Sequence, residues 1–125
     1  MSDSTKTNPR VLVVDDEESA RTLLQEFLKL EGFPVEVAEA GEEALAKIYN
    51  YHPRVVLLDV MMPRLTGDEL VKMIKDWKPE IQVIMVSANA SPELEEECLR
   101  NGAFACIRKP VNFDLLTEAI DQALN

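Results

Sequence analysis

The chain of 125 residues contains little cysteine, histidine or glycine and no long hydrophobic run. Cys98 and Cys106 are its two cysteines, and their spacing is not the Cys-x-x-Cys of a metal module. This argues against a disulfide framework or a zinc site and favours a reducing compartment. No apolar stretch approaches the roughly 18 residues of a membrane span, and the run at residues 11–14 is too short for a signal peptide. We therefore expect a cytoplasmic protein that does not enter a membrane.

Basic residues are also scarce. The sequence has 13 lysines and arginines against 23 aspartates and glutamates, a formal net charge of −10. Such a surface repels nucleic acid phosphates and anionic lipids, so we expect no direct binding to either. The hydrophobic share of 46% is typical of a globular protein, and the length suits one domain. We expect residues 1–9 to form a flexible polar tail and residues 10–125 to form that domain.

Short apolar runs alternate with segments of helical periodicity. The runs lie at residues 11–14, 35–38, 55–58, 81–86 and 105–107. Continuous β-branched runs predict strands that are covered on both faces. Between the first two runs, Leu23, Leu24 and Leu28 share the spacing of one helix face. The repeated strand and helix units predict an α/β fold in which a single doubly wound parallel sheet, (βα)5, has helices on both faces.

Several residues mark the expected helix ends. Gly32 and Gly102 stand where a left-handed residue ends a helix, and Ser91 before Pro92 predicts a capped helix start. His52 precedes Pro53, which favours an extended conformation at His52.

Two of the predicted helices differ in their apolar content. The segment after Ser91 offers little beyond Leu94, Cys98 and Leu99, so we expect a weakly packed helix that is able to move. The last helix has an apolar stripe wider than one buried face. Its surplus, including Phe113 or Leu115, is available to a partner or a second copy of the chain, or wraps around the sheet edge.

Polar side chains follow the predicted strands at their carboxyl ends. Asp15 and Asp16 follow the first strand, and Asp59, Ser87 and Lys109 follow the third, fourth and fifth. In open α/β sheets, ligands bind outside these ends where the strand order reverses. If the first strand lies beside the third, the three aspartates converge, and their repulsion favours a bound cation. Mg²⁺ prefers such oxygen ligands, whereas a helix N-cap is the alternative for Asp16 alone.

The same set of residues suits phosphoryl transfer. A metal ion and an ammonium group spread the charge of the transferring group, and an aspartate nucleophile yields an acyl phosphate. The hydroxyl of Ser87 then donates to a phosphoryl oxygen. Taken singly, Ser87 also fits a strand-end cap and Lys109 a solvated surface position, so their common placement carries the prediction.

The chain resembles the receiver domains (CheY-like) of two-component response regulators. The matching segments are residues 11–17 (Val-Leu-Val-Val-Asp-Asp-Glu), 57–63 (Leu-Leu-Asp-Val-Met-Met-Pro) with Gly67, 86–88 (Val-Ser-Ala), Gly102-Ala103 and Lys109-Pro110. The resemblance covers the chain from Arg10 to its end. It implies a flavodoxin-like sheet of order 2-1-3-4-5.

The resemblance also implies a role for each acidic position. Asp59 would be the phosphoacceptor, supplied by a phosphohistidine on a sensor histidine kinase or a histidine phosphotransfer protein. Asp16 would ligate Mg²⁺ directly and Asp15 through water, together with Asp59 and the backbone carbonyl of Met61. Mn²⁺ is the alternative ion.

The switch region departs from the family at one position. Ser87 and Lys109 would contact the phosphoryl group, and the bond before Pro110 would be cis. Relatives often carry an aromatic residue three positions before the lysine, where this chain has Cys106, most simply a small buried apolar residue. We therefore expect signalling to depend on Ser87 and on the loop and helix that follow it.

These observations predict a phosphorylation-dependent signalling switch that is not an enzyme in the ordinary sense, although it assists its own phosphorylation and dephosphorylation. An effector protein or an output domain would read its state, and a phosphorylation-dependent homodimer is a further expected assembly. The chain is either a stand-alone regulator or the receiver of a longer protein. The alternatives are an aspartate-nucleophile phosphatase, which the adjacent Asp15 and Asp16 disfavour, and a phosphorylation-independent interaction module.

Overall fold

The computed structural model describes residues 9–59, 67–88 and 91–125. In these segments five strands alternate with five helices. The strands are β1 (Val11–Val14), β2 (Val35–Ala38), β3 (Val55–Asp59), β4 (Gln82–Ser87) and β5 (Ala105–Arg108). The helices are α1 (Glu18–Leu30), α2 (Gly41–Tyr51), α3 (Gly67–Trp77), α4 (Pro92–Arg100) and α5 (Phe113–Leu124).

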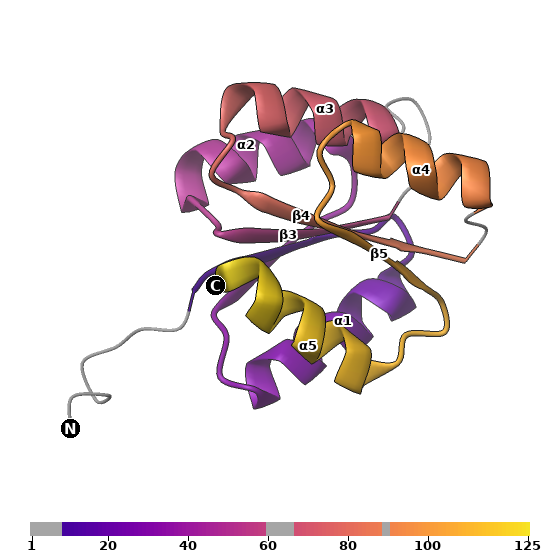
Figure 1. Cartoon of the computed structure of the whole chain (residues 1–125). Coiled ribbons are helices and arrows are strands. Elements are labelled where there is room, and N and C mark those ends of the chain that lie inside the picture. Colours follow the sequence, from indigo (N-terminus) through magenta and orange to yellow (C-terminus); the bar gives the residue numbers. More distant parts are fainter. Residues whose placement is uncertain (1–8, 60–66, 89–90) are drawn as a thin grey trace.

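The strands form one parallel sheet in the order β2-β1-β3-β4-β5, which confirms the predicted α/β topology. Helices α1 and α5 cover one face of the sheet, and α2, α3 and α4 cover the other (Figure 1). The chain reverses its direction across the sheet between β1 and β3, which are neighbours without being consecutive. This is the position at which open α/β sheets bind their ligands.

Each face of the sheet has its own apolar cluster. In β1, Leu12 and Val14 belong to the cluster under α2, α3 and α4, whereas Val11 and Val13 belong to the cluster under α1 and α5. All four side chains are buried, because successive residues of a strand point to opposite faces. A strand covered on both faces buries the side chains of successive residues, which explains the near-continuous apolar runs in the sequence.

The helix ends agree with the sequence prediction at three positions and differ at a fourth. Gly32 and Gly102 have positive φ values of 93° and 116°, and the hydroxyl of Ser91 accepts the Leu94 N–H at 3.1 Å. The extended conformation expected for His52 is wrong, since its φ of 56° and ψ of 57° are left-handed. There the His52 N–H donates to the Ile48 carbonyl at 3.1 Å, and this bond at the end of α2 outweighs the preference of a residue before proline.

The last two helices differ in their buried apolar residues, as the sequence predicted. Helix α4 has Cys98 as its buried residue, whereas α5 buries Leu116, Ile120 and Ala123. The Phe113 ring packs against Phe27 of α1 with ring centroids 4.4 Å apart. Leu115 remains 54% exposed, so the apolar surplus of α5 lies there. No helix in the described segments is both long and apolar enough to cross a membrane.

Candidate functional site

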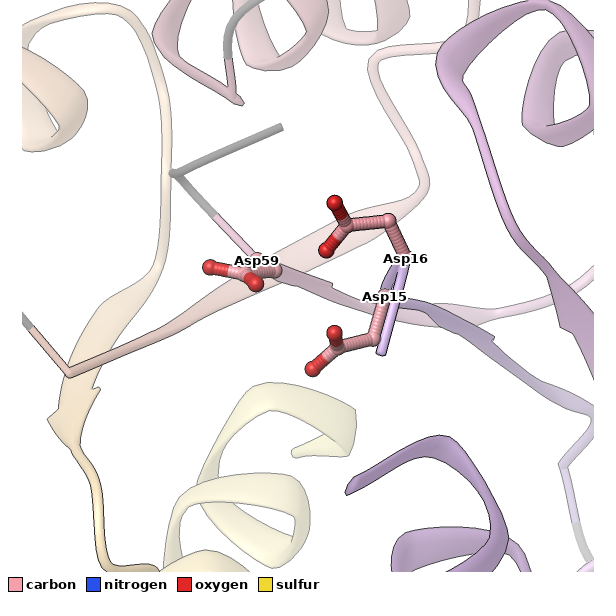
Figure 2. Close-up of side chains that lie close together, drawn as sticks. All are labelled: Asp15, Asp16 and Asp59. Atoms are coloured by element: carbon pink, nitrogen blue, oxygen red, sulfur yellow. The ribbon is translucent and has the colours of Figure 1, made fainter. Parts of the chain in front are cut away.

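Three carboxylates meet at the carboxyl ends of β1 and β3. Asp15 and Asp16 follow β1, and Asp59 is the last residue of β3. These strands are paired, with Val14 opposite Leu58, so the aspartates lie side by side. One carboxylate oxygen from each lies within 4.8 Å of the others, and Figure 2 shows the side chains pointing toward a common space. Asp15 and Asp59 are buried and Asp16 is exposed.

Lys109 brings a positive charge into this cluster. Its Nζ donates to Asp15 Oδ2 at 2.8 Å and lies 3.6 Å from Asp59 Oδ2. Partial burial lowers the pKa of Lys109, but the hydrogen bond to Asp15 and the charges of Asp15 and Asp59 outweigh it, so the pKa lies above the ordinary 10.5. The side chain is therefore an ammonium group at neutral pH, between two carboxylates.

Neighbouring backbone groups hold this arrangement in place. The second oxygen of Asp15, Oδ1, accepts the Glu17 N–H at 2.9 Å. The Lys109 N–H donates to the Ser87 carbonyl at 2.9 Å, and the peptide bond from Lys109 to Pro110 is cis. Both oxygens of Asp15 are thus engaged, which fixes the orientation of its carboxylate.

Arg21 is a contributor that the sequence did not reveal. From the first turns of α1, its Nη1 donates to the Asp15 backbone carbonyl at 2.8 Å. The contact supports the peptide that carries Asp15 and Asp16. The only signal in the sequence is an arginine about one turn into the helix that follows Asp15 and Asp16. Arginines are common on exposed helix surfaces, so this position alone did not indicate the contact.

Ser87 is the last residue of β4 and is completely buried. It pairs with Arg108 of β5 and follows Val86, which is opposite Asp59. The backbone of Ser87 therefore lies between the strand that carries Asp59 and the strand that leads to Lys109. Met61, expected to offer its backbone carbonyl to the ion, lies outside the described residues.

Cys106 is a half-buried thiol that packs against the cluster containing Cys98. Burial raises the pKa of the Cys106 thiol, the charge of Glu95 raises it further, and Arg108 lowers it in part. The side chain is therefore a neutral apolar group at physiological pH. It lines a pocket of about 400 Å³ between α4, β5 and α5.

The donor set is chemically suited to a small divalent cation. Three carboxylates and one ammonium leave an excess of negative charge, and carboxylate oxygens are the ligands that Mg²⁺ prefers. A cation would also relieve the repulsion between the aspartates. The fold and the cluster together define a flavodoxin-like domain with an acidic crevice at the carboxyl ends of its strands, whose donor set suits a small divalent cation.

Comparison with known proteins gives the family. The family model for the response regulator receiver domain matches residues 11–121. The chain is 36% identical over 115 residues to the regulatory protein AtoC of Escherichia coli (strain K12), covering 92% of this chain and 25% of AtoC. It is 40% identical over 114 residues to a cyclic di-GMP phosphodiesterase of Thermotoga maritima, covering 91% of this chain and 30% of that protein.

Solved structures agree with this result. A CheY-like receiver domain protein from Methanospirillum hungatei has a TM-score of 0.87 at 36% identity, covering 94% of each chain. The chemotaxis protein CheY4 of Vibrio cholerae has a TM-score of 0.87 at 33% identity, covering 94% of this chain and 99% of that one. The chain belongs to the response regulator receiver domain family, in which phosphorylation-dependent switching is general. It spans less than a third of the two curated relatives named above.

Proposed function

We propose that Asp59 is the phosphoacceptor of this receiver domain. The observation that carries the proposal is the position of the Lys109 ammonium, 2.8 Å from Asp15 and 3.6 Å from Asp59. An ammonium group next to a buried carboxylate can neutralise the charge of an incoming phosphoryl group. The domain would comprise residues 10–125, with residues 1–9 as a tail of which 1–8 lie outside the described residues.

The reaction is a transfer of one phosphoryl group to a carboxylate oxygen. An Asp59 oxygen attacks the phosphorus of a phosphohistidine, an O–P bond forms and the P–N bond breaks. The bonding electrons leave with the imidazole, and the product is an acyl phosphate on Asp59. Lys109 pairs with the phosphoryl oxygens, the Ser87 hydroxyl donates to one of them, and the fixed carboxylate of Asp15 keeps Lys109 in position.

Receiver domains generally bind Mg²⁺ at an acidic cluster. We propose that Asp15, Asp16 and Asp59 hold this ion here, with Mn²⁺ as a substitute of similar chemistry. When bound, the ion supplies charge neutralisation to the phosphoryl oxygens. The backbone carbonyl of Met61 remains a predicted further ligand.

The partners follow from this chemistry. The homologues are two-component regulators, which implies a kinase and an effector. The donor would be a sensor histidine kinase or a histidine phosphotransfer protein. The reader would be an effector protein, an output domain or a second phosphorylated copy, acting through Ser87 and the segment after it. The free thiols of Cys98 and Cys106 support the expected cytoplasmic location.

The phosphodiesterase relative raises the question of enzymatic activity. The chain corresponds to 30% of that protein, so the activity in its name belongs to the relative as a whole. We propose that this chain turns over no external substrate beyond its own phosphorylation and dephosphorylation. Release of many equivalents of phosphate from a generic phosphoester with Mg²⁺ would instead support an aspartate-nucleophile phosphatase.

The direct test is incubation with Mg²⁺ and acetyl phosphate, followed by intact mass spectrometry. We expect one added phosphoryl group on the wild-type chain and none on Asp59→Asn. The matched control is Asp121→Asn, which removes an exposed carboxylate near the end of α5 and should leave the modification unchanged. Phosphorylation of Asp59→Asn at the wild-type rate would contradict the assignment.

A further inference from the structure

Arg108 joins the proposed phosphorylation site to α4. In β5, Ile107 belongs to the cluster under α1 and α5, whereas Cys106 packs on the α4 side of the sheet. Side chains alternate along a strand, so Arg108 shares the face of Cys106. Its Nε donates to Glu95 Oε2 of α4 at 3.0 Å. The ion pair lines the pocket of about 400 Å³ beside Cys106.

The backbone of Arg108 is tied to the two groups expected to contact the phosphoryl group. Arg108 pairs with Ser87 in the parallel register of β4 and β5. The next residue, Lys109, donates its N–H to the Ser87 carbonyl at 2.9 Å. A movement of the Ser87 or Lys109 backbone would therefore reach Arg108 directly, through the strand pairing with Ser87 or the peptide bond to Lys109.

The two ends of α4 are attached differently. At the C-terminal end, Asn101 Nδ2 donates to the Asp68 carbonyl at 3.3 Å, and Cys98 is fully buried. In the first half of α4, residues 92–96, Leu94 is partly buried and Glu95 pairs with Arg108. The Arg108 side chain is 63% exposed and that of Glu95 27%. The first half is thus held by few, partly exposed contacts, and such segments open most easily.

We propose that Arg108 is a positioning residue that, through its ion pair with Glu95, sets the orientation of the first half of α4 according to the state of Asp59. The role rests on the proposed phosphorylation of Asp59. It gives this chain a polar connection between β5 and α4 at a site where Cys106 offers no aromatic ring. An exposed ion pair changes an equilibrium constant by about 1.5- to 5-fold, which is enough to tune the balance between two conformations without fixing it.

Hydrogen exchange on the unphosphorylated protein tests the pair itself. We expect the amides of residues 94–98 to exchange about 1.5- to 5-fold faster in Glu95→Gln and in Arg108→Gln. The double variant should be no faster than either single variant, because both remove the same interaction. In Arg108→Lys, which keeps the positive charge, the exchange rates should lie between those of the wild type and those of Arg108→Gln. The differences should shrink in 1 M NaCl, where the Debye length is about 3 Å.

The matched control is Glu93→Gln, the same chemical change at an exposed residue in the same helix turn. It separates the ion pair from the general effect of an acidic residue near a helix N-terminus. Wild-type exchange rates in Arg108→Gln, or equal acceleration in Glu93→Gln and Glu95→Gln, would overturn the proposal. The proposal would also fail if the accelerations of exchange in Glu95→Gln and Arg108→Gln added up in the double variant, because the two substitutions would then act independently.

Coupling to the site is measured after treatment with Mg²⁺ and acetyl phosphate, with occupancy checked by intact mass. In the wild type we expect phosphorylation to change the exchange of residues 94–98, and in Arg108→Gln this change should be reduced. An equal change in both proteins would overturn the coupling. If no phosphoryl group is added to Asp59, the proposed function fails, while the exchange rates of the unphosphorylated variants still report on the ion pair.

Discussion

The two ends of the sheet use charged side chains in opposite ways. At the carboxyl ends of the strands, Lys109 and the three aspartates face one another in a shared crevice. At the amino ends, Lys75 Nζ donates to the Pro79 and Ile81 carbonyls, each at 2.7 Å. The first group brings three carboxylates around one ammonium group and leaves an excess of negative charge, whereas the Lys75 ammonium group donates hydrogen bonds to backbone oxygens. The charged side chains at the carboxyl ends therefore contact one another, whereas Lys75 at the amino ends stabilises the turn between α3 and β4.

A second basic side chain at the amino ends follows the same pattern. Arg10 Nη1 donates to the Tyr51 carbonyl at 3.0 Å, and its guanidinium lies 5.5 Å from the centroid of the Tyr51 ring. Both interactions connect the start of β1 to the end of α2. The difference between the ends predicts that substitutions at the carboxyl ends change phosphorylation most, and substitutions at the amino ends change stability most.

The largest expected effect is at Lys109. Lys109→Met should slow phosphorylation by acetyl phosphate by about 100-fold or more, because it removes a positioned charge from the transition state. Lys75→Met, the same change at the other end of the sheet, should leave the rate within about two-fold. The measurement is the rate of phosphoryl incorporation by intact mass. If phosphorylation were slowed equally in both variants, the lysines at the two ends of the sheet would not differ in their effect on the reaction.

The next effect is the stabilisation by Mg²⁺. An ion at 100 times its dissociation constant raises the free energy of unfolding by about 2.7 kcal/mol, because it binds the folded chain. Urea unfolding with and without Mg²⁺ should show this increase in the wild type and in Asp76→Asn, whose aspartate pairs with Lys72 on the surface of α3. Asp16→Asn should lose most of it. Full stabilisation in Asp16→Asn would remove Asp16 from the ion site.

Gly102 offers a test at the amino ends. Gly102→Ala should lower the free energy of unfolding by about 1–3 kcal/mol, because strained backbone conformations have costs of this size. Its φ is +116°, and an added Cβ would lie 2.7 Å from Lys75 Cγ. The phosphorylation rate should not change. In Lys75→Ala the additional loss from Gly102→Ala should be smaller, since the side chain that obstructs the methyl group is shortened; equal losses would exclude the contact as a cause.

The smallest expected effect concerns how the free energy of unfolding changes at alkaline pH in Lys109→Met and in Lys75→Met. It is measured by urea unfolding in the presence of EDTA. The pKa of Lys109 lies above 10.5, since hydrogen bonding and nearby carboxylates outweigh burial. Its stabilising contribution is therefore complete below the unfolded pKa and is lost as the pH rises through the folded pKa. Burial lowers the pKa of Lys75 below 10.5, so its contribution becomes more favourable as the pH rises toward that value.

The advantage of the wild type over Lys109→Met should thus shrink at high pH, and its advantage over Lys75→Met should grow. Parallel curves for the two variants would show that the two ammonium groups experience similar surroundings.

The sequence alone determined the strands, the helices and the type of sheet. Runs such as residues 11–14 and 55–58 are apolar at every position because both faces of these parts of the sheet are covered by helices. Gly32 and Gly102 marked helix ends because positive φ values favour glycine. The polar residues at the strand ends predicted the acidic cluster, since parallel strands bring their carboxyl ends to one edge. All of these are local patterns or consequences of a regular topology.

The tertiary structure decided what depends on residues distant in sequence. Lys109 and Asp15 are 94 positions apart, and neither residue encodes the partner or the distance of 2.8 Å. Leu23 and Leu24 belong to the same apolar stripe of α1, yet Leu23 is 55% exposed and Leu24 is 3% exposed. The packing of α1 on the sheet decides which side of the stripe is covered. The pairing of Arg108 with Glu95 has the same origin. Periodicity fixes which residues share a face, and only the packed chain fixes what that face contacts.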